Sequence, residues 1–397
     1  MSLLDGHVVV VGLGFGDEGK GAVVDALCAG RPTTAVVRFN GGAQAAHNVV
    51  ADGRHHTFSQ FGAGTFAGVP THLSRFVLVE PFALAEEARR LEVAGVRDPL
   101  SLLSVDGRAL LTTPFHVHAN RAREDARGAN RHGSCGKGIG ETVWYSLLPG
   151  AAPGAVVENQ EVIGTPGEAP TVADCARPPV LRRKLDALAR FYAPLATPPH
   201  GVDELVALYR DFAGAVRITD GDETGRLADS GRLVFEGAQG VLLDQHHGFH
   251  PHTTWSTTTP HNARALLGGR PHAVVGVTRT YLTRHGAGPL PTESATVLAR
   301  FPEAHNGTGE YQGTWRAGHL DAALLDYAIA ACEGVDALAV THLDASGLKV
   351  VPADGSPAVD LPDPLTWFGA RLPVAVAGYG PDRAGYRLVE TRSTINA

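Results

Sequence analysis

A glycine-rich loop follows the first apolar segment of the chain. His7–Gly12 is a β-branched run typical of a buried strand, and apolar helical periodicity returns at Ala22–Leu27. The loop between them contains Gly16, Asp17, Glu18, Gly19, Lys20 and Gly21. Its glycines let backbone N–H groups converge on oxygen atoms, and its lysine offsets negative charge. A strand, loop and helix of this composition predict a phosphate-binding loop.

The loop departs from the usual phosphate-binding pattern in two ways. Gly21 stands where Ser or Thr would hold Mg²⁺, and Asp17 and Glu18 put carboxylates into a loop suited to anions. A carboxylate there is explained if Asp17 binds Mg²⁺ or removes a proton from a substrate. The alternative interpretation is a glycine turn with solvated charges.

Strand-like and helix-like segments alternate along the rest of the chain. We expect further strands at 34–39, 75–79, 101–111, 233–236, 272–280, 337–341 and 373–377. Helices are expected at 83–93, 181–191, 202–213 and 320–332. This alternation predicts an α/β fold with a mainly parallel central sheet flanked by helices. Residues 149–179 are rich in Pro, Gly and Ala and predict a long loop. The chain is therefore expected to form a single domain over 1–397, with a loop and helical insertion at 149–216.

Composition excludes several classes of protein. Of 397 residues, 44% are hydrophobic and 19% charged, which is enough apolar material for a core and excludes a disordered chain. The net charge of −7 without a basic block argues against nucleic-acid binding. No window of about 18 apolar residues predicts a membrane span. Four widely spaced cysteines form no disulfide framework and favour a reducing compartment, so a cytoplasmic location is expected.

An aspartate near the other end of the chain suggests which nucleotide binds. A buried strand at 336–340 leads into Thr341-His342-Leu343-Asp344. A carboxylate beyond a strand's end can accept both N–H groups on one edge of guanine, and adenine offers no such donor pair. An aspartate in a turn is the simpler alternative, but together with a phosphate loop Asp344 suggests GTP.

Several ordered motifs resemble the adenylosuccinate synthetase family, with this chain as a divergent member. They are Gly-Asp-Glu-Gly-Lys-Gly at 16–21, Phe-Glu-Gly-Ala-Gln-Gly at 235–240, Thr-Arg at 283–284 with Gly-Ala-Gly-Pro at 286–289, Gly-His-Leu-Asp at 318–321 and Gly-Pro-Asp-Arg at 380–383. The resemblance implies a P-loop-like GTP-binding architecture with helical and loop insertions. It also implies a GTP- and Mg²⁺-dependent C–N ligase of purine biosynthesis, which phosphorylates the 6-oxygen of IMP and replaces it with the amine of aspartate. A homodimer is implied as well.

The resemblance also implies roles for individual residues. Asp17 would take the N1 proton and bind Mg²⁺, His47 would stabilise the phosphoryl group in flight, and Gln239 would hold the 6-oxygen side of the base. The backbone carbonyl of Ala46 falls on a second Mg²⁺-ligand position. GTP would be bound by Gly16, Glu18, Gly19, Lys20, Gly21, His342, Asp344, Gly378, Gly380 and Pro381. Gln44, Ser134, Cys135, Thr254, Thr314 and Arg316 fall on substrate-binding positions.

The departures from the family fall mainly on substrate contacts. Gln44 replaces Asn, and Ser134-Cys135-Gly136-Lys137 replaces Thr-Thr-Gly-Arg. The arginine-rich loop that grips aspartate is here Asn306–Ala317, with one arginine and a new acid, Glu310. Each lost charge-assisted hydrogen bond weakens recognition by about 1.5–3 kcal/mol. We therefore hypothesise that the GTP-dependent activation is retained and that the acceptor, the amine donor or both have changed. Compensating arginines could be Arg279, Arg284, Arg121 and Arg131.

Two further interpretations stay open. A paralogue with a changed acceptor or amine could serve a specialised nucleoside pathway, and a non-catalytic GTP-binding module is the rival from another class. Asp17 and His47 argue against the module, because nucleotide binding needs neither. A histidine cluster, His246, His247, His250 and His252, could hold Zn²⁺ or Ni²⁺, although polar contacts around the nucleotide explain it more simply.

Overall fold

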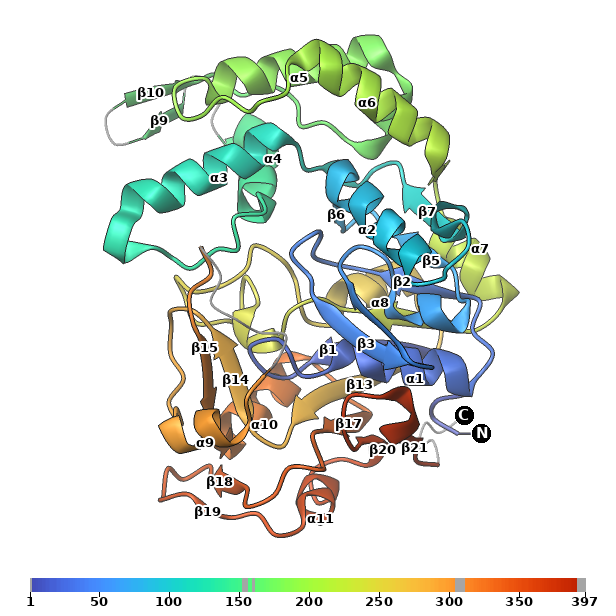
Figure 1. The fold of residues 1–397 in the computed structure, drawn as a ribbon, viewed down its shortest axis with the longest axis vertical. Coiled ribbons are helices and arrows are strands. Elements are labelled where there is room, and N and C mark those ends of the chain that lie inside the picture. Colours follow the sequence, from blue (N-terminus) through green and yellow to red (C-terminus); the bar gives the residue numbers. More distant parts are fainter. Residues whose placement is uncertain (1, 152–155, 159–160, 304–310, 391–397) are drawn as a thin grey trace.

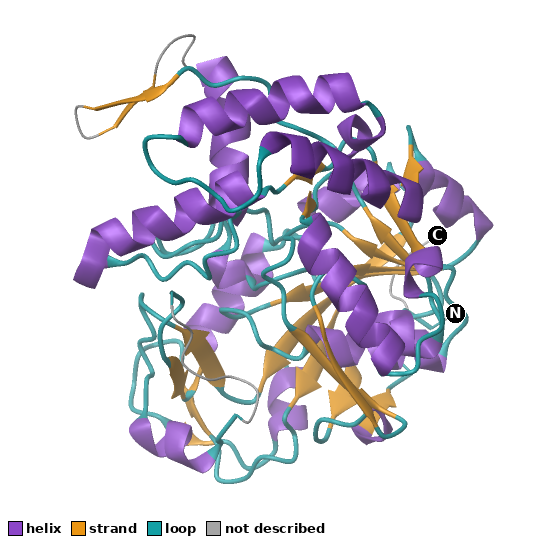
Figure 2. Ribbon diagram, turned by 45° about the horizontal axis from the view of Figure 1, so that its top comes forward, coloured by secondary structure: helices purple, strands orange, loops and turns teal. Residues whose placement is uncertain are grey.

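A ten-stranded sheet forms the centre of the computed structural model, which describes residues 2–151, 156–158, 161–303 and 311–390 (Figures 1 and 2). In spatial order its strands are β11 (Arg217–Thr219), β7 (Leu103–Asp106), β5 (Thr71–Leu73), β2 (Ala35–Arg38), β12 (Leu233–Glu236), β1 (His7–Gly12), β13 (His272–Arg279), β17 (Ala337–Thr341), β20 (Val374–Gly378) and β21 (Tyr386–Leu388). The neighbouring strands are parallel except at the β20–β21 edge. The predicted fold class, an α/β fold around a mainly parallel sheet, is confirmed.

Helices and short strand pairs surround this sheet. The helices are α1 (Lys20–Gly30), α2 (Pro81–Val93), α3 (Pro114–Arg127), α4 (Ile139–Ala151), α5 (Pro178–Tyr192), α6 (Val202–Ala215), α7 (Glu223–Ser230), α8 (His261–Leu267), α9 (Ala295–Arg300), α10 (Ala322–Ala331) and α11 (Pro364–Gly369). The remaining strands are β3 (His47–Ala51) with β4 (Arg54–Phe58), β6 (Leu78–Val79) with β8 (Leu110–Leu111), β9 (Val156–Glu158) with β10 (Glu161–Gly164), β14 (Leu282–His285) with β15 (Trp315–Gly318), and β16 (Leu320–Asp321) with β18 (Lys349–Val351) and β19 (Val359–Asp360). In the part of the chain that the structure describes, no helix is both long and apolar enough to cross a bilayer.

Both faces of the sheet are buried, which explains why its central strands are continuous apolar runs. Along β1, Val8 and Val10 belong to the core on the side of α1, whereas Val9 and Val11 belong to the core on the side of α8 and α10. Side chains alternate between the two faces along a strand, so each face receives every second valine. The loops at the carboxyl ends of the strands are then free to carry polar groups.

Several predicted elements are confirmed and a few predictions are wrong. β1, β12 and β17 have the predicted bounds, and α2, α5 and α6 extend the predicted helices by a turn or less at each end. The strand predicted at 75–79 is reduced to β6, because a turn closed by Val77 N–H on the carbonyl of Ser74 occupies its start. The strand predicted at 101–111 is divided into β7 and β8 by a turn, in which Asp106 accepts the N–H of Arg108.

Two other segments also differ from expectation. The long loop predicted at 149–179 contains the β9–β10 hairpin, whose β-branched residues the Pro, Gly and Ala content masked. Residues 320–321 begin a strand, β16, rather than the predicted helix. Asp321 caps α10, because its Oδ1 accepts the N–H of Leu324 at 3.0 Å.

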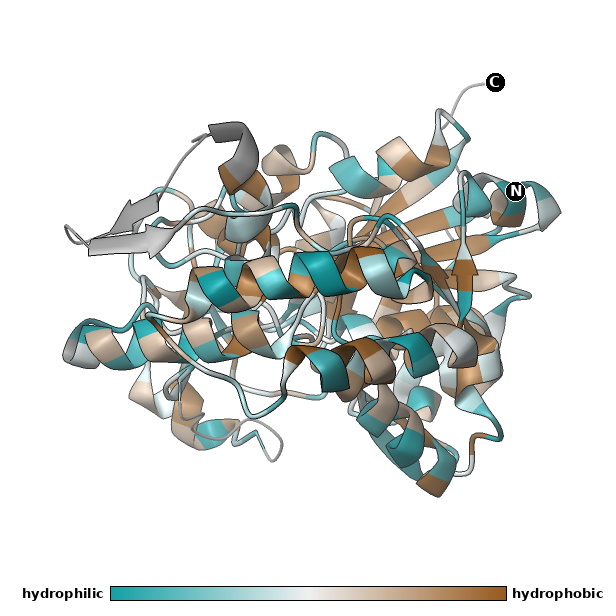
Figure 3. Cartoon of the chain, turned by 90° about the horizontal axis from the view of Figure 1, so that it is seen from above, coloured by the Kyte–Doolittle hydropathy of each residue, from teal (hydrophilic) through white to brown (hydrophobic). Residues whose placement is uncertain are grey.

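Helices α5 and α6 lie above α3 and α4, at the top of Figure 1. Polar and apolar residues alternate along both helices, as the interleaved colours in Figure 3 show, and Leu181, Leu185 and Leu188 of α5 are buried. An aromatic cluster joins the two layers, with Phe191 packed edge-on against Tyr145 and Tyr192 at ring-centroid distances of 5.2 and 4.9 Å. Helix α5 thereby packs against α3 and α4, which form one wall of the cavity described below.

We expect Phe191→Ala to lower the free energy of unfolding by about 3–5 kcal/mol, because it empties a well-packed aromatic site that is 1% exposed. Leu208→Ala on α6 is the matched control, since Leu208 is 38% exposed and should cost far less. Urea-induced unfolding measures both. Equal losses in the two variants would contradict the packing described here.

Candidate active site

A cavity of about 1610 Å³ opens at the carboxyl ends of the parallel strands, where open α/β sheets bind their ligands. It is lined by loops that follow the strands of the sheet and by residues of α3 and α4. The predicted site residues among its lining are Gly16, Asp17, Gly19, Lys20, Gly21, Gln44, Ala46, His47, Ser134, Cys135, Gln239, Thr254, His342, Asp344, Gly380 and Pro381. Glu18, Gly378, Thr314 and Arg316 are not among the lining residues.

Glu18 shapes the glycine-rich loop from inside. Its buried Oε1 accepts hydrogen bonds from the N–H groups of Gly14 (2.9 Å) and Gly16 (2.8 Å), and its Oε2 lies 2.6 Å from Nζ of Lys20. Gly12 leaves room for this carboxylate, because a Cβ there would lie 2.2 Å from Oε2. Glu18 therefore belongs to the interior of the loop and holds Lys20 at a defined place on the cavity floor.

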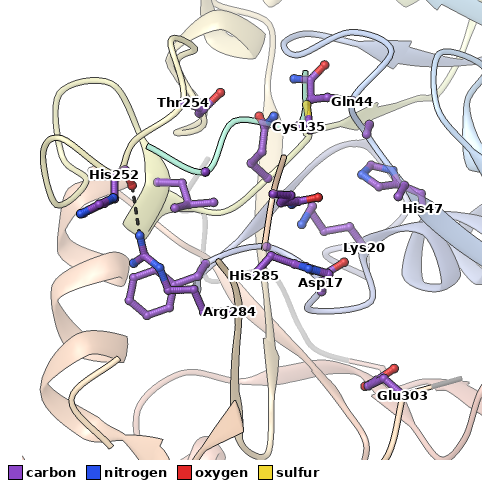
Figure 4. A pocket seen from close by; sticks show the side chains of 18 of the residues that line it. Asp17, Lys20, Gln44, His47, Cys135, His252, Thr254, Arg284, His285 and Glu303 are labelled. Carbon is purple, nitrogen blue, oxygen red and sulfur yellow. Dashed lines mark hydrogen bonds and ion pairs between the residues drawn. The ribbon is translucent and has the colours of Figure 1, made fainter. Parts of the chain in front are cut away.

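Asp17 points the other way, toward the cavity (Figure 4). Its backbone has a φ of 60°, in the left-handed region, and the guanidinium of Arg279 binds its carbonyl oxygen through Nε. Its Oδ2 lies 3.6 Å from Nε2 of His285. Burial raises the pKa of the Asp17 carboxyl above its ordinary value of 3.8, although His285 and Arg279 oppose the shift. A carboxylate with a raised pKa is better matched to accepting a proton than an ordinary one.

His47 is anchored by a buried carboxylate. Its Nδ1 lies 2.5 Å from Oε1 of Glu236, and the other oxygen of Glu236 accepts the N–H of Ala63 at 2.9 Å. Burial lowers the pKa of His47 below 6.5, against the influence of Glu236. Although burial alone would raise it, Arg38 and His47 hold the pKa of Glu236 below its ordinary range. Because the charged carboxylate of Glu236 accepts a hydrogen bond from Nδ1, the ring proton lies on Nδ1. Nε2 is then available to a bound molecule.

The position of His47 explains the glycine at position 21. A Cβ on Gly21 would lie 2.7 Å from Cβ of His47. The start of α1 and the start of β3 approach each other so closely that Ser or Thr would not fit there. Gly21, which departs from the usual phosphate-loop pattern, therefore leaves the space in which the imidazole of His47 lies next to the loop.

Two carboxamides lie above the loop, and neither has all its polar atoms paired. Both amide atoms of Gln44 and the Oε1 of Gln239 are buried and have no hydrogen-bond partner among the described residues. The two side chains lie on the same side of Gly41, where a Cβ would be 3.3 Å from Nε2 of Gln44 and 3.9 Å from Oε1 of Gln239. Unpaired buried amides are costly, so they indicate a ligand with both donors and acceptors, such as a nucleobase.

The far end of the cavity is formed by the loops after β17 and β20. His342 and Asp344 line it together with Gly380 and Pro381, and burial holds the pKa of His342 well below 6.5. Asp344 is close to Gly380, where a Cβ would be 3.9 Å from Oδ2. Gly378 lies behind this wall at the end of β20, where its carbonyl accepts the N–H of Leu343 at 3.0 Å. Asp344 thus lines the end of the cavity that the loops after β17 and β20 form.

The arginines are largely committed to the protein itself. Arg316 forms a two-pronged ion pair with Glu293 and donates to the carbonyls of Gly286 and Gly288. Arg284 donates to three backbone carbonyls, and burial lowers its pKa to about 10.

Of the four arginines expected to compensate, Arg279 and Arg284 line the cavity, whereas Arg121 and Arg131 do not. Arg279 is itself ion-paired with Glu303. Glu310, the acid predicted in the altered loop, lies outside the described residues.

The histidine cluster does not gather as a ligand set. His246, His250 and His252 line the cavity, but among the residues that the structure describes no group of three or more His, Cys, Asp or Glu could hold a metal ion. Asp244, the acid nearest in sequence, accepts the N–H groups of His246 and Thr258 at 2.8 and 2.6 Å. The polar interpretation of these histidines fits this arrangement better.

Sequence reasoning missed three residues of the site. Glu236 was seen only as part of a motif, although a carboxylate at the end of a buried apolar strand is itself a signal of a buried partner. His285 stands between two motif segments, and Glu303 lies in a segment without periodicity. Sequence spacing could not have paired them with Asp17 and Arg279, which come from other elements.

Comparisons with known proteins agree with this geometry. The family model of adenylosuccinate synthetase matches residues 9–352. The adenylosuccinate synthetase of Methylibium petroleiphilum is 36% identical over 85% of this chain and 77% of its own length. The Desulfosudis oleivorans protein of that name is 31% identical over 96% of this chain and 89% of its own length.

Two solved structures share the fold. Fully ligated adenylosuccinate synthetase from Plasmodium falciparum superposes with a TM-score of 0.79 at 20% identity, covering 96% of this chain and 99% of that one. A cyanophage S-2L succinoaminodeoxyadenylate synthetase superposes with a TM-score of 0.66 at 19% identity, covering 97% and 95%.

We expect Glu236→Gln to lower the pKa of His47 by about 1 unit or more, because the carboxylate is the group that raises it against burial. An NMR titration of the imidazole measures the change. Glu86→Gln, on the exposed face of α2, is the control and should leave the His47 titration unchanged. An unchanged or raised His47 pKa in Glu236→Gln would show that Glu236 does not set the state of this ring.

Proposed function

The chain belongs to the adenylosuccinate synthetase family of GTP-dependent C–N ligases, and we propose that it uses GTP to activate the 6-oxygen of a purine nucleotide, which an amine then replaces. The observation that carries this proposal is the meeting of Asp17, Lys20 and His47 in one cavity with Gln44 and Gln239. A proton acceptor, a phosphate-binding cation and a phosphoryl-stabilising imidazole are the groups that such an activation needs.

In the activation step, Asp17 accepts the N1 proton of the base, and the 6-oxygen, which gains negative charge, attacks the terminal phosphorus of GTP. Lys20 and the backbone N–H groups of the glycine-rich loop bind the phosphates. His47 stabilises the phosphoryl group in transfer when the ring is doubly protonated, with a proton on Nε2 as well as on Nδ1. The carboxylate of Glu236 favours this form of the ring. Gln239 and Gln44 orient the acceptor base through their unpaired amide atoms.

GTP rather than ATP is the proposed phosphoryl donor. Asp344 lies at the end of the cavity away from Gln44 and Gln239, beside Gly380 and Pro381, where a carboxylate can accept the two N–H groups of guanine. His342 contributes a polar side chain to the lining of this proposed guanine site. Gly378 holds the adjacent loop through the hydrogen bond that its carbonyl accepts from Leu343.

The residues present also fit Mg²⁺, which prefers oxygen ligands. Asp17 and Ala46 both line the cavity, where the carboxylate of one and the backbone carbonyl of the other would hold the ion together with phosphate oxygens. Bound Mg²⁺ would neutralise negative charge on the phosphates.

The substrate class is a 6-oxopurine nucleotide of the IMP type, with an amino acid of the aspartate type as amine donor. The wall formed by Ser134, Cys135 and Thr254 would take up the nucleotide phosphate. The solved cyanophage structure of this fold carries dGMP and dATP, so related cavities admit other purine nucleotides.

A changed donor is the second candidate, and one observation favours it. Arg316, the single arginine between 304 and 317, is bound to Glu293 and two carbonyls, and neither it nor Thr314 lines the cavity. A dicarboxylate would need guanidinium partners that are not already paired.

We further propose that the chain acts as a single domain over 1–397 with the insertion at 149–216, as a homodimer in the cytoplasm. Leu147 on α4 and Trp255 near the cavity mouth are 52% and 41% exposed, as expected for residues covered by a second copy. The four cysteines are free, which suits a reducing compartment.

Asp17→Asn should lower turnover by about 10²–10⁴-fold and leave GTP binding nearly intact, because an amide keeps the shape of the carboxylate but accepts no proton. Phosphate release and fluorescence titration with a labelled GTP analogue measure the two effects. Unchanged turnover in this variant would contradict the role of Asp17 as proton acceptor, whereas GTP binding without turnover in the wild-type protein would favour the non-catalytic GTP-binding module. Asp52→Asn, in the exposed turn between β3 and β4, is the control.

A substrate panel identifies the reaction. With GTP and Mg²⁺, we expect phosphate release that depends on both a 6-oxopurine nucleotide (IMP, GMP or dGMP) and an amine (L-aspartate, L-glutamate, glycine, L-lysine or ammonia). Full activity with IMP and aspartate at ordinary concentrations would refute the changed-donor candidate. Phosphate release that ignores every acceptor would refute the ligase.

A further inference from the structure

His285 stands beside the proposed base at the reacting end of the cavity. It is the last residue of β14, and its Nε2 lies 3.6 Å from Oδ2 of Asp17 (Figure 4). The ring lines the cavity and packs edge-on against Trp315 of the paired strand β15, at a centroid distance of 4.7 Å. A two-stranded ladder and an aromatic neighbour thus hold an imidazole next to Asp17.

The two ring nitrogens of His285 have different surroundings. Nδ1 is buried and has no hydrogen-bond partner among the described residues. Nε2 is the nitrogen that lies beside the carboxylate of Asp17. By comparison, the ring of His47 is bound to Glu236, and that of His342 faces the hydroxyl of Thr341 at 3.0 Å. The geometry therefore puts Nε2 of His285 at the reacting end of the cavity.

The stoichiometry of the proposed reaction requires a second proton acceptor. The acceptor base loses its N1 proton, and an amine that arrives as an ammonium ion loses two of its three protons when it forms one C–N bond. Three protons therefore leave the reacting atoms. The departing phosphate, which carries away the 6-oxygen, takes one of them as HPO₄²⁻. Asp17 takes the N1 proton, so one proton remains without an acceptor.

We propose that His285 accepts that proton from the incoming ammonium group and so generates the free amine that attacks carbon 6. The inference rests on the proposed function. Carbon 6 is bonded to N1, so an imidazole beside the carboxylate that reaches N1 is beside the point of amine attack. The amine nitrogen forms its bond to carbon 6, the bond from carbon 6 to the phosphorylated oxygen breaks, and Asp17 and His285 return their two protons to solvent.

Two basic groups near Asp17 are already paired. The carboxylate of Glu303 is ion-paired with Arg279, and Nζ of Lys20 is ion-paired with Glu18. His252 has an unpaired Nδ1, but Arg284 holds its backbone carbonyl in the wall away from Asp17 (Figure 4). His285 is the imidazole placed against Asp17.

The test separates activation from amination. Activation is followed without amine, as scrambling of an oxygen-18 label from the β,γ-bridge of GTP in the presence of IMP. Amination is followed as phosphate release with the member of the amine panel that the wild-type protein uses best. We expect His285→Gln to keep the scrambling rate and to lose amination by roughly 10²–10⁴-fold, because glutamine accepts no proton. His272→Gln is the matched control, because His272 is the first residue of β13, at the end of that strand away from Arg279 and the cavity. This variant should keep both the scrambling rate and the amination rate.

Hydroxylamine provides a second readout that a purely structural role would not move. It is largely free base at neutral pH, so it needs no proton acceptor before attack. We expect His285→Gln to use hydroxylamine at close to the wild-type rate, and His285→Ala to recover amination when imidazole is added.

The role of His285 would be overturned if His285→Gln lost activity equally with the amine and with hydroxylamine, or lost activity with neither. It would also be overturned if imidazole did not restore amination by His285→Ala. An absence of label scrambling in the wild-type protein would instead contradict the proposed function.

Discussion

The inward-facing carboxylate of Glu18 is the interaction on which the site depends. It binds two backbone N–H groups and Lys20 inside the glycine-rich loop, whereas the carboxylate of its neighbour Asp17 faces the cavity. Two adjacent acids in the sequence thus have different places in the structure. Glu18 holds the lysine of the loop in position, and Asp17 is accessible from the cavity.

The same principle recurs across the cavity. Charged side chains also position His47 and Asp17: Glu236 binds His47, Arg279 binds the backbone carbonyl of Asp17, and Glu303 in turn is ion-paired with Arg279. Such pairs stabilise the fold only weakly after desolvation, but they fix geometry. Under the proposed function, these pairs position the groups that act on the phosphoryl group, and the unpaired amides of Gln44 and Gln239 would bind the acceptor base.

The fold and the position of the glycine-rich loop could be predicted because they follow from local patterns. A run of valines such as that in His7–Gly12 predicts a strand that is buried on both faces. Gly16 and Gly19 predict a loop with left-handed backbone, and both have a positive φ. The orientation of Glu18 and the partners of Arg316 could not be predicted, because they depend on atoms brought together from distant strands. The steric reason for Gly21 likewise appears only when β3 meets α1. The sequence therefore identified the types of residue at the site better than the orientation and the partners of their side chains.

A crystal structure with a non-hydrolysable GTP analogue, Mg²⁺ and IMP tests the proposed activation step most directly. We expect the guanine to lie against Asp344 and the terminal phosphorus to lie between His47 and the 6-oxygen of the base, with Asp17 at N1. A terminal phosphorus remote from both Asp17 and His47 would contradict it.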